Sequence, residues 1–110
     1  MERRNLNLGA AVLAIIKSKG NRGAFSDEIT RSILRLRQNF DLEAVTLRPG
    51  PTGPDSDRIR SLVGVFVVRG FLKEDSPAKL TKEGEKWMND QLRAYFKDGR
   101  RLEEFWARVG

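Results

Sequence analysis

Residues 49–54 read Pro-Gly-Pro-Thr-Gly-Pro, and this run constrains the fold more than any other part of the chain. Proline has no backbone N–H to donate and holds φ near one value, so such a run excludes a helix and a central strand. We therefore predict a long loop over 39–54, without regular structure across 48–54. The loop separates two predicted helices from a second group of predicted elements.

Two amphipathic helices are predicted before the loop. The first begins at the cap candidates Asn5 and Asn7 and ends at Gly20. The second begins at the cap candidate Ser26 and carries acidic residues in its first turn. Apolar residues recur at helical spacing on one face of each: Leu8, Val12, Ile15 and Ile16 in the first, Ile29, Ile33 and Leu36 in the second.

After the loop we predict a helix, a hairpin and a long final helix. Asp55 or Ser56 caps a third helix that ends at Gly70, and short strands at 71–73 and 79–80 flank a turn over 75–78. Thr81 caps a fourth helix that runs to about residue 98, and one or two further helical turns follow. The predicted fold class is mainly α with a small antiparallel β-hairpin.

Composition narrows the function classes. The 110 residues are the ordinary size of one domain, and they include no cysteine and no histidine. Disulfides, thiolate or imidazole metal ligands and histidine-based catalysis are thereby excluded. The acidic residues are scattered or lie in first helical turns, and the 49–54 run has no Walker lysine. We therefore expect no enzyme, no cofactor and no metal.

Charge and hydropathy indicate the surroundings of the chain. Lys and Arg number 21 against 15 Asp and Glu, a formal net charge of +6, which favours a polyanionic partner although a solvated charged surface has the same composition. No apolar stretch is long enough to span a bilayer, and we expect no signal peptide before the domain. We expect a cytoplasmic protein without a membrane partner.

The segments around the hairpin resemble a known fold. Residues 67–74 read Val-Val-Arg-Gly-Phe-Leu-Lys-Glu, and 79–84 read Lys-Leu-Thr-Lys-Glu-Gly. This pattern resembles the winged-helix regulators of the PadR-like and MarR-like families, and Leu80, Thr81 and Gly84 match their leucine-threonine-x-x-glycine sequence. The resemblance implies a three-helix core, a wing and a long C-terminal helix, and a homodimeric transcription regulator that binds double-stranded DNA. The loop over 39–54 is longer than the turn usual in these families.

A helix that enters the major groove contacts base edges through its exposed N-terminal side chains. The third helix, at about 55–69, offers Arg60 for guanine, Ser61 for a base or a phosphate, and Arg58 for the backbone. Asp57 and Gly64 share this polar face, and Gly64 suits either close approach to DNA or packing against another helix. Phosphate contacts are expected from five further residues: Arg31, Arg35, Arg48, Lys73 and Lys79.

The C-terminal part, 81–110, is expected to be a helical dimerisation extension of a DNA-binding core over 1–80. Its apolar residues cover an arc that one small core cannot easily bury, and large exposed apolar patches mark interfaces. The expected homodimer contacts are Trp87, Met88, Leu92, Tyr95, Phe96, Leu102, Phe105 and Trp106. Alternatively, the last helix folds back and completes the core of its own chain.

Two other functions remain open. The winged-helix fold also serves as a protein-interaction or assembly module without DNA contact, because a fold does not determine a function. Charge spread evenly over the surface would favour this alternative, and charge gathered on the third helix and hairpin would favour DNA. Association with RNA or the ribosome is compatible with the same net charge.

Overall fold

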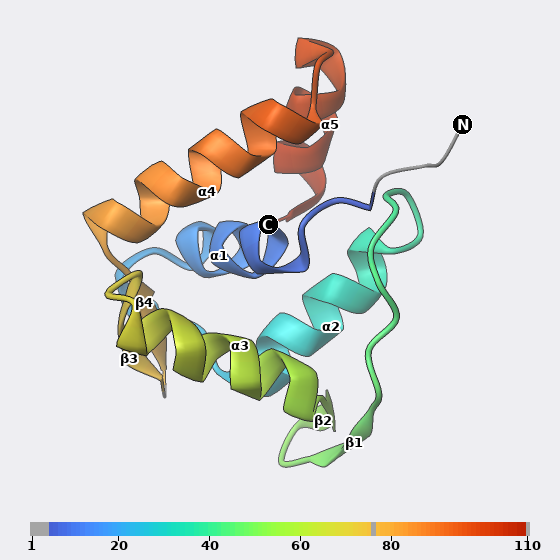
Figure 1. Ribbon diagram of the computed structural model, residues 1–110. Coiled ribbons are helices and arrows are strands. Elements are labelled where there is room, and N and C mark those ends of the chain that lie inside the picture. The colour runs from blue at the N-terminus through green and yellow to red at the C-terminus, as the bar shows by residue number, and fades with distance from the viewer. Residues whose placement is uncertain (1–4, 76, 110) are drawn as a thin grey trace.

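The computed structural model describes residues 5–75 and 77–109. The described chain is mainly helical, with two small antiparallel two-stranded sheets (Figure 1). In order the elements are α1 (Leu8–Ser18), a 3-10 turn η1 (Gly20–Arg22), α2 (Ser26–Leu36), β1 (Arg48–Gly50), β2 (Gly53–Asp55), α3 (Asp57–Val68), β3 (Leu72–Asp75), β4 (Ala78–Leu80), α4 (Lys82–Tyr95) and α5 (Gly99–Val109). None of the described helices is long and apolar enough to cross a membrane.

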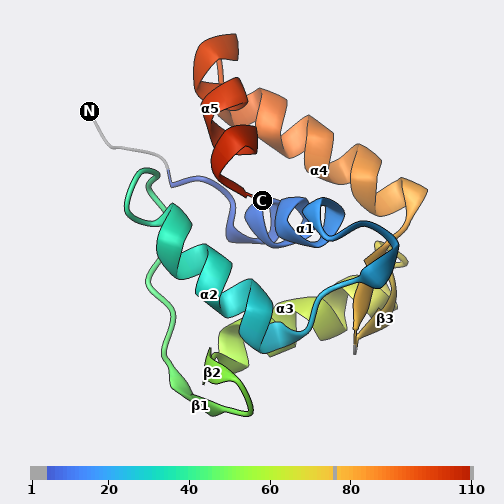
Figure 2. The ribbon, with the colours of Figure 1, turned by 180° about the vertical axis from the view of Figure 1, so that it is seen from behind.

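Helix α1 lies at the centre of the molecule. Every residue from Leu8 to Ile16 is buried, and α2, α4, α5 and β4 all pack against the helix. Figures 1 and 2 show α4 on one side of α1 and α3 on the other. A helix that is apolar all round belongs in a core. The predicted apolar face of α1 is confirmed as buried, and burial extends round the helix because alanine and glycine fill positions between the larger apolar residues.

Side-chain caps fix where three of the helices begin. The side-chain oxygen of Asn7 accepts a hydrogen bond from the Ala10 amide at 3.1 Å, and the Thr81 hydroxyl accepts one from the Gly84 amide at 3.1 Å. Ser56, one of the two predicted caps of α3, accepts from Ile59 at 3.4 Å. These caps are confirmed. The predicted cap Ser26 is wrong, since it is already the first residue of α2.

Residues 48–55 form an antiparallel ribbon, so the prediction of no regular structure across 48–54 is wrong. β1 pairs with β2, and Arg48 faces Asp55, Pro49 faces Pro54 and Gly50 faces Gly53. Both strands of a two-stranded ribbon are edge strands, where proline is tolerated. Pro49 and Pro54 lie opposite each other, so the two residues without an N–H group occupy a single residue pair of the ribbon.

The predicted hairpin is confirmed as β3 and β4, and it gains a third extended segment. Ala24, between η1 and α2, forms an antiparallel bridge with Ala78, with N···O distances of 3.0 and 2.8 Å. The Thr81 hydroxyl donates to the Gly70 carbonyl at 2.6 Å and closes the base of the hairpin. The hairpin is thus tied to the segment before α2 and to the end of α3.

The last helix, α5, is longer than the predicted one or two turns, and it folds back onto the core. The Phe105 ring is fully buried and lies 5.5 Å from the rings of both Phe40 and Phe96. Met88 and Leu92 of α4 are equally buried. The expectation that the chain cannot bury this arc is therefore wrong for Met88, Leu92, Phe96 and Phe105. Four of the expected contacts stay half-buried: Trp87, Tyr95, Leu102 and Trp106.

Candidate nucleic-acid interface

Helix α3 lies at the surface, between the β1–β2 ribbon at its N-terminus and the β3–β4 hairpin at its C-terminus (Figure 1). It packs inward through Ile59, Val63 and Phe66. The opposite side is exposed, as the helical periodicity predicted for Arg60 and Ser61. The helix therefore presents one long face to solvent over its whole length.

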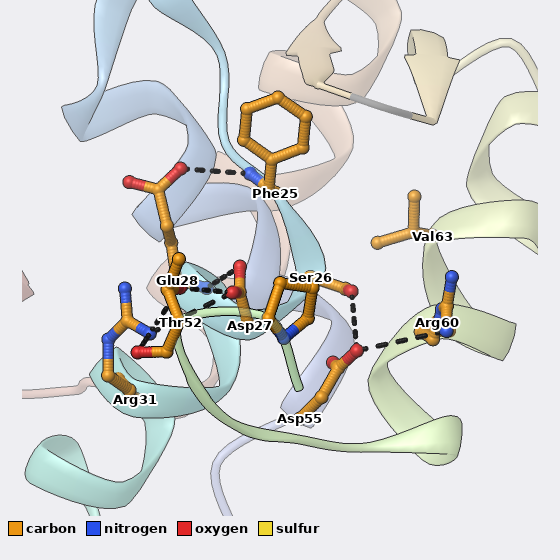
Figure 3. A pocket seen from close by; sticks show the side chains of 10 residues that line it. Phe25, Ser26, Asp27, Glu28, Arg31, Thr52, Asp55, Arg60 and Val63 are labelled. Carbon is orange, nitrogen blue, oxygen red and sulfur yellow. Dashed lines mark hydrogen bonds and ion pairs between the residues drawn. The ribbon is translucent and has the colours of Figure 1, made fainter. Parts of the chain in front are cut away.

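The ribbon fixes the start of α3 through a buried carboxylate. The Ser26 hydroxyl of α2 donates to Asp55 Oδ2 at 3.1 Å (Figure 3). The Ser56 amide donates to Asp55 Oδ1 at 2.8 Å. Arg60 Nη1 lies 3.8 Å from Asp55 Oδ2. Asp55 thus joins the first residue of α2, the cap of α3 and the predicted base-contacting arginine.

A second carboxylate holds the tip of the ribbon on α2. The Thr52 hydroxyl donates to Asp27, and Arg31 Nη1 donates to the Thr52 carbonyl at 3.1 Å and lies 3.9 Å from Asp27 Oδ2. The Thr52 hydroxyl, helped by the Glu28 amide and the Arg31 charge, holds the pKa of Asp27 below its usual value, although burial acts in the opposite direction. Arg31, predicted to contact phosphate, thus bonds the ribbon.

An open cleft of about 670 Å³ lies between these two networks. Figure 3 shows Ser26, Asp27, Thr52 and Asp55 along it, with the Phe25 ring to one side. The sequence does not predict the cleft, because its walls come from α2, the β1–β2 ribbon and α3, and the proline-rich run predicts a loop in place of the ribbon. Among the residues described, no group of acidic side chains could hold a metal ion.

The predicted arginine contacts on this side of the molecule all have acidic partners within the chain. Arg48 Nε lies 3.1 Å from Asp57 Oδ1, and Arg58 Nη2 lies 3.3 Å from Glu43 Oε1. All four arginine side chains, Arg31, Arg48, Arg58 and Arg60, are about half exposed. The pairs of Arg48 and Arg58 are exposed on both sides and contribute only about 0–1 kcal/mol each, so a phosphate can displace their carboxylates. The partners of Arg31 and Arg60, Asp27 and Asp55, are buried, so breaking these two pairs leaves a buried carboxylate with fewer partners.

The remaining predicted phosphate contacts lie elsewhere. Lys73 and Lys79 line a shallow hollow with Lys17 and Lys82, at the end of α3 away from the ribbon. Arg35 donates to the Ser32 hydroxyl at 3.1 Å on α2. The structure brings together Arg48, Arg58, Arg60 and Ser61 around the first turns of α3, and it separates the two hairpin lysines from them.

Comparisons with protein-family models, with curated proteins and with solved structures found no match. What the chain does must therefore follow from its own geometry.

Thr52→Val is expected to lower the free energy of unfolding near neutral pH, because Asp27 loses its strongest hydrogen bond. A lowered pKa in the folded chain contributes stability above the unfolded value of about 3.9, and that contribution is lost as pH falls through the folded pKa. The variant should therefore differ from the wild type most at pH 7 and least at pH 2. Urea unfolding at several pH values gives the free energy of unfolding of the wild type and of the variant. A difference between them that does not change with pH would contradict the role of Thr52 in lowering the pKa of Asp27.

Proposed function

We propose that the chain is a winged-helix protein that binds double-stranded DNA through α3. One observation carries the proposal: Arg58, Arg60 and Ser61 are exposed together on the first two turns of a surface helix. The order α1, α2, α3, β3–β4 hairpin and α4 supports it, with the β1–β2 ribbon inserted between α2 and α3, as does the bridge that Ala24 adds to the hairpin. A helix of this kind fits the major groove, and its N-terminal side chains reach base edges.

Each residue has a separate role in this proposal. Arg60 forms a bidentate pair with guanine, and Ser61 bonds a base or a phosphate. Arg58 and Arg48 flank the helix start and bind the phosphates on either side, which positions the protein without reading sequence. The acidic partners keep these side chains extended before DNA arrives, and phosphate then replaces the carboxylates.

Binding to random-sequence duplex DNA, followed by fluorescence anisotropy across a salt series, tests the proposal. Arg58→Ala should reduce the log–log salt slope by about 1, because one phosphate contact is lost. On a duplex selected for tight binding, Arg60→Ala should weaken binding about 5- to 150-fold. Arg93→Ala on α4 removes the same charge from the other side of α1 and is the matched control. Absence of wild-type binding at low salt would overturn the proposal.

Asp57→Asn is expected to strengthen DNA binding. The carboxylate of Asp57 is largely exposed beside Arg48, and on DNA it would oppose the phosphates. Its removal takes away this repulsion and the carboxylate that Arg48 must leave when it binds phosphate, so the affinity should rise, most strongly at low salt. The same anisotropy series measures the effect, with Glu103→Gln on α5 as the control of equal charge change. Unchanged or weaker binding by Asp57→Asn would place Arg48 away from the DNA.

One observation favours a second candidate function, a winged-helix protein-interaction module. Val68 is 89% exposed and Val65 is 48% exposed at the C-terminal end of the same face of α3. Exposed apolar side chains on one helix face are typical of surfaces that bind other proteins. The salt series separates the two candidates, since this module would not bind duplex DNA.

The homodimer remains a separate proposal with a smaller surface than the sequence predicted. The half-buried side chains Trp87, Tyr95, Leu102 and Trp106 are the remaining part of the expected interface. A two-fold dimer through them would place two copies of α3 on a palindromic site, about 34 Å apart. Sedimentation equilibrium of the wild-type chain over a range of concentrations distinguishes a monomer from a dimer.

A further inference from the structure

Three glycines lie inside helices of the described chain, and the space beside them differs. A Cβ on Gly9 would lie 2.6 Å from the Phe66 ring, and one on Gly84 would lie 2.2 Å from the Phe71 carbonyl oxygen. A Cβ on Gly64, in the middle of α3, would meet nothing within 4 Å. Packing within the chain therefore explains Gly9 and Gly84, and it does not explain Gly64.

Gly64 lowers the stability of α3. Glycine in a helix interior reduces the folding equilibrium constant roughly fivefold relative to alanine. At Gly64 no neighbouring element benefits from the missing side chain, so the packing alternative that the sequence left open does not apply. The open space beside Gly64 leaves room for a surface that approaches α3 from outside the chain.

The residues around Gly64 form one continuous face. Arg60, Gly64 and Val68 follow each other at intervals of four, and Val65 lies beside them. Val68 is the most exposed large apolar residue among those described. The face thus begins with hydrogen-bonding side chains, becomes flat at Gly64 and ends with valine methyl groups.

We propose that this face reads thymine as well as guanine, with Val65 and Val68 on thymine C5-methyl groups about two to four base pairs from the guanine and Gly64 allowing the helix to approach closely. The proposal rests on the DNA-binding function above. Thymine alone among the four bases presents a methyl group in the major groove, where apolar side chains contact it. Arg58 and Arg60 flank this face and are exposed, each beside a carboxylate. The net charge of +6 on the whole chain favours DNA over an apolar protein partner as the occupant.

The first test replaces single thymines by deoxyuridine in a duplex selected from a random library for tight binding. Loss of one buried methyl group should weaken binding about fourfold at one or two positions and leave the other positions unchanged. Val68→Ala should weaken binding to the thymine duplex by a similar factor. It should add nothing when the contacted thymine is already deoxyuridine. Leu47→Ala, which shortens a half-exposed apolar side chain outside α3, is the control.

The second test uses Gly64→Ala, which separates stability from binding. The variant should raise the folding equilibrium constant up to about fivefold, because its Cβ enters open space. It should weaken binding to the selected duplex about fivefold or more, because the added methyl group prevents close approach. A purely structural role for Gly64 would not move the two quantities in opposite directions.

The outcomes are distinct. If the wild-type chain binds no duplex, the DNA-binding function fails and this inference fails with it. If the chain selects a duplex and every deoxyuridine substitution and Gly64→Ala leave its affinity unchanged, the inference alone is overturned, and the valine face is assigned to a protein partner. The thymine contact is supported if deoxyuridine weakens binding of the wild type at particular positions and has no such effect on binding of Val68→Ala.

Discussion

Phe105→Ala is expected to lower the free energy of unfolding by about 3–5 kcal/mol, the range for truncating a fully buried phenylalanine. The ring has no exposed surface and packs edge-on against Phe40 and at an angle against Phe96. Its removal leaves a cavity between α5 and the segment after α2, which the surrounding rings cannot easily fill. Urea denaturation of both proteins gives the difference directly.

The same experiment separates the two roles that the sequence left open for Phe105. As a core residue it stabilises each chain, so the loss should not depend on protein concentration. If Phe105 were a dimer contact, the variant would still fold as a monomer, and the loss of stability relative to the wild type would depend on protein concentration. Glu103→Ala, an exposed position on the same helix, should change stability by no more than about 0.5 kcal/mol. A concentration-dependent loss would return Phe105 to an interface.

Gly84→Ala is expected to be the second large effect, a loss of about 3 kcal/mol. The new Cβ would lie 2.2 Å from the Phe71 carbonyl oxygen and 2.9 Å from Leu80 Cδ1. The Phe71 carbonyl cannot move away freely, because it accepts a hydrogen bond from the Thr81 amide at 3.1 Å. Relief therefore requires α4 to shift from the base of the hairpin.

Gly99→Ala is the matched control for this clash. Gly99 begins α5 and has nothing within 4 Å of its Cβ position, so the substitution should not destabilise the chain. Thermal unfolding of both variants tests the pair. A fully stable Gly84→Ala would mean that the close approach of α4 to the hairpin is not needed. The contact also gives the physical reason for glycine in the leucine-threonine-x-x-glycine sequence.

Local signals predicted much of the fold. The caps Asn7, Ser56 and Thr81 hold because each bonds an amide three residues ahead in the chain, which a sequence displays directly. The β1–β2 ribbon was missed because its stability depends on bonds from Asp27 and Arg31 of α2, more than twenty residues earlier. The preference of proline for loops is a local property, and it does not show that α2 will hold the ribbon through Asp27 and Arg31.

The same division applies to the candidate site. Helical periodicity predicted that Arg58, Arg60 and Ser61 would be exposed, and they are. It did not predict the carboxylate beside each arginine: Glu43 reaches Arg58 only through the path of the loop, and Asp55, although it directly precedes the α3 cap, is turned toward Arg60 by the ribbon. The burial of Phe105 was left open for a similar reason, because a helical pattern does not show which way the chain turns at Gly99.

The β1–β2 ribbon is attached to α2 at two points, and this makes the orientation of α3 independent of the length of the connection between the two helices. In a tight turn, the number of connecting residues sets the angle between the helices. Here Ser26 and Asp27 hold the ribbon, so the mostly exposed stretch at 43–47 acts mainly as a tether, apart from the Glu43–Arg58 pair and the packing of Val45 on the core. Doubling the length of such a tether costs only about 0.6 kcal/mol in closure entropy. Evolution can therefore lengthen or shorten this stretch while the orientation of α3 is inherited unchanged.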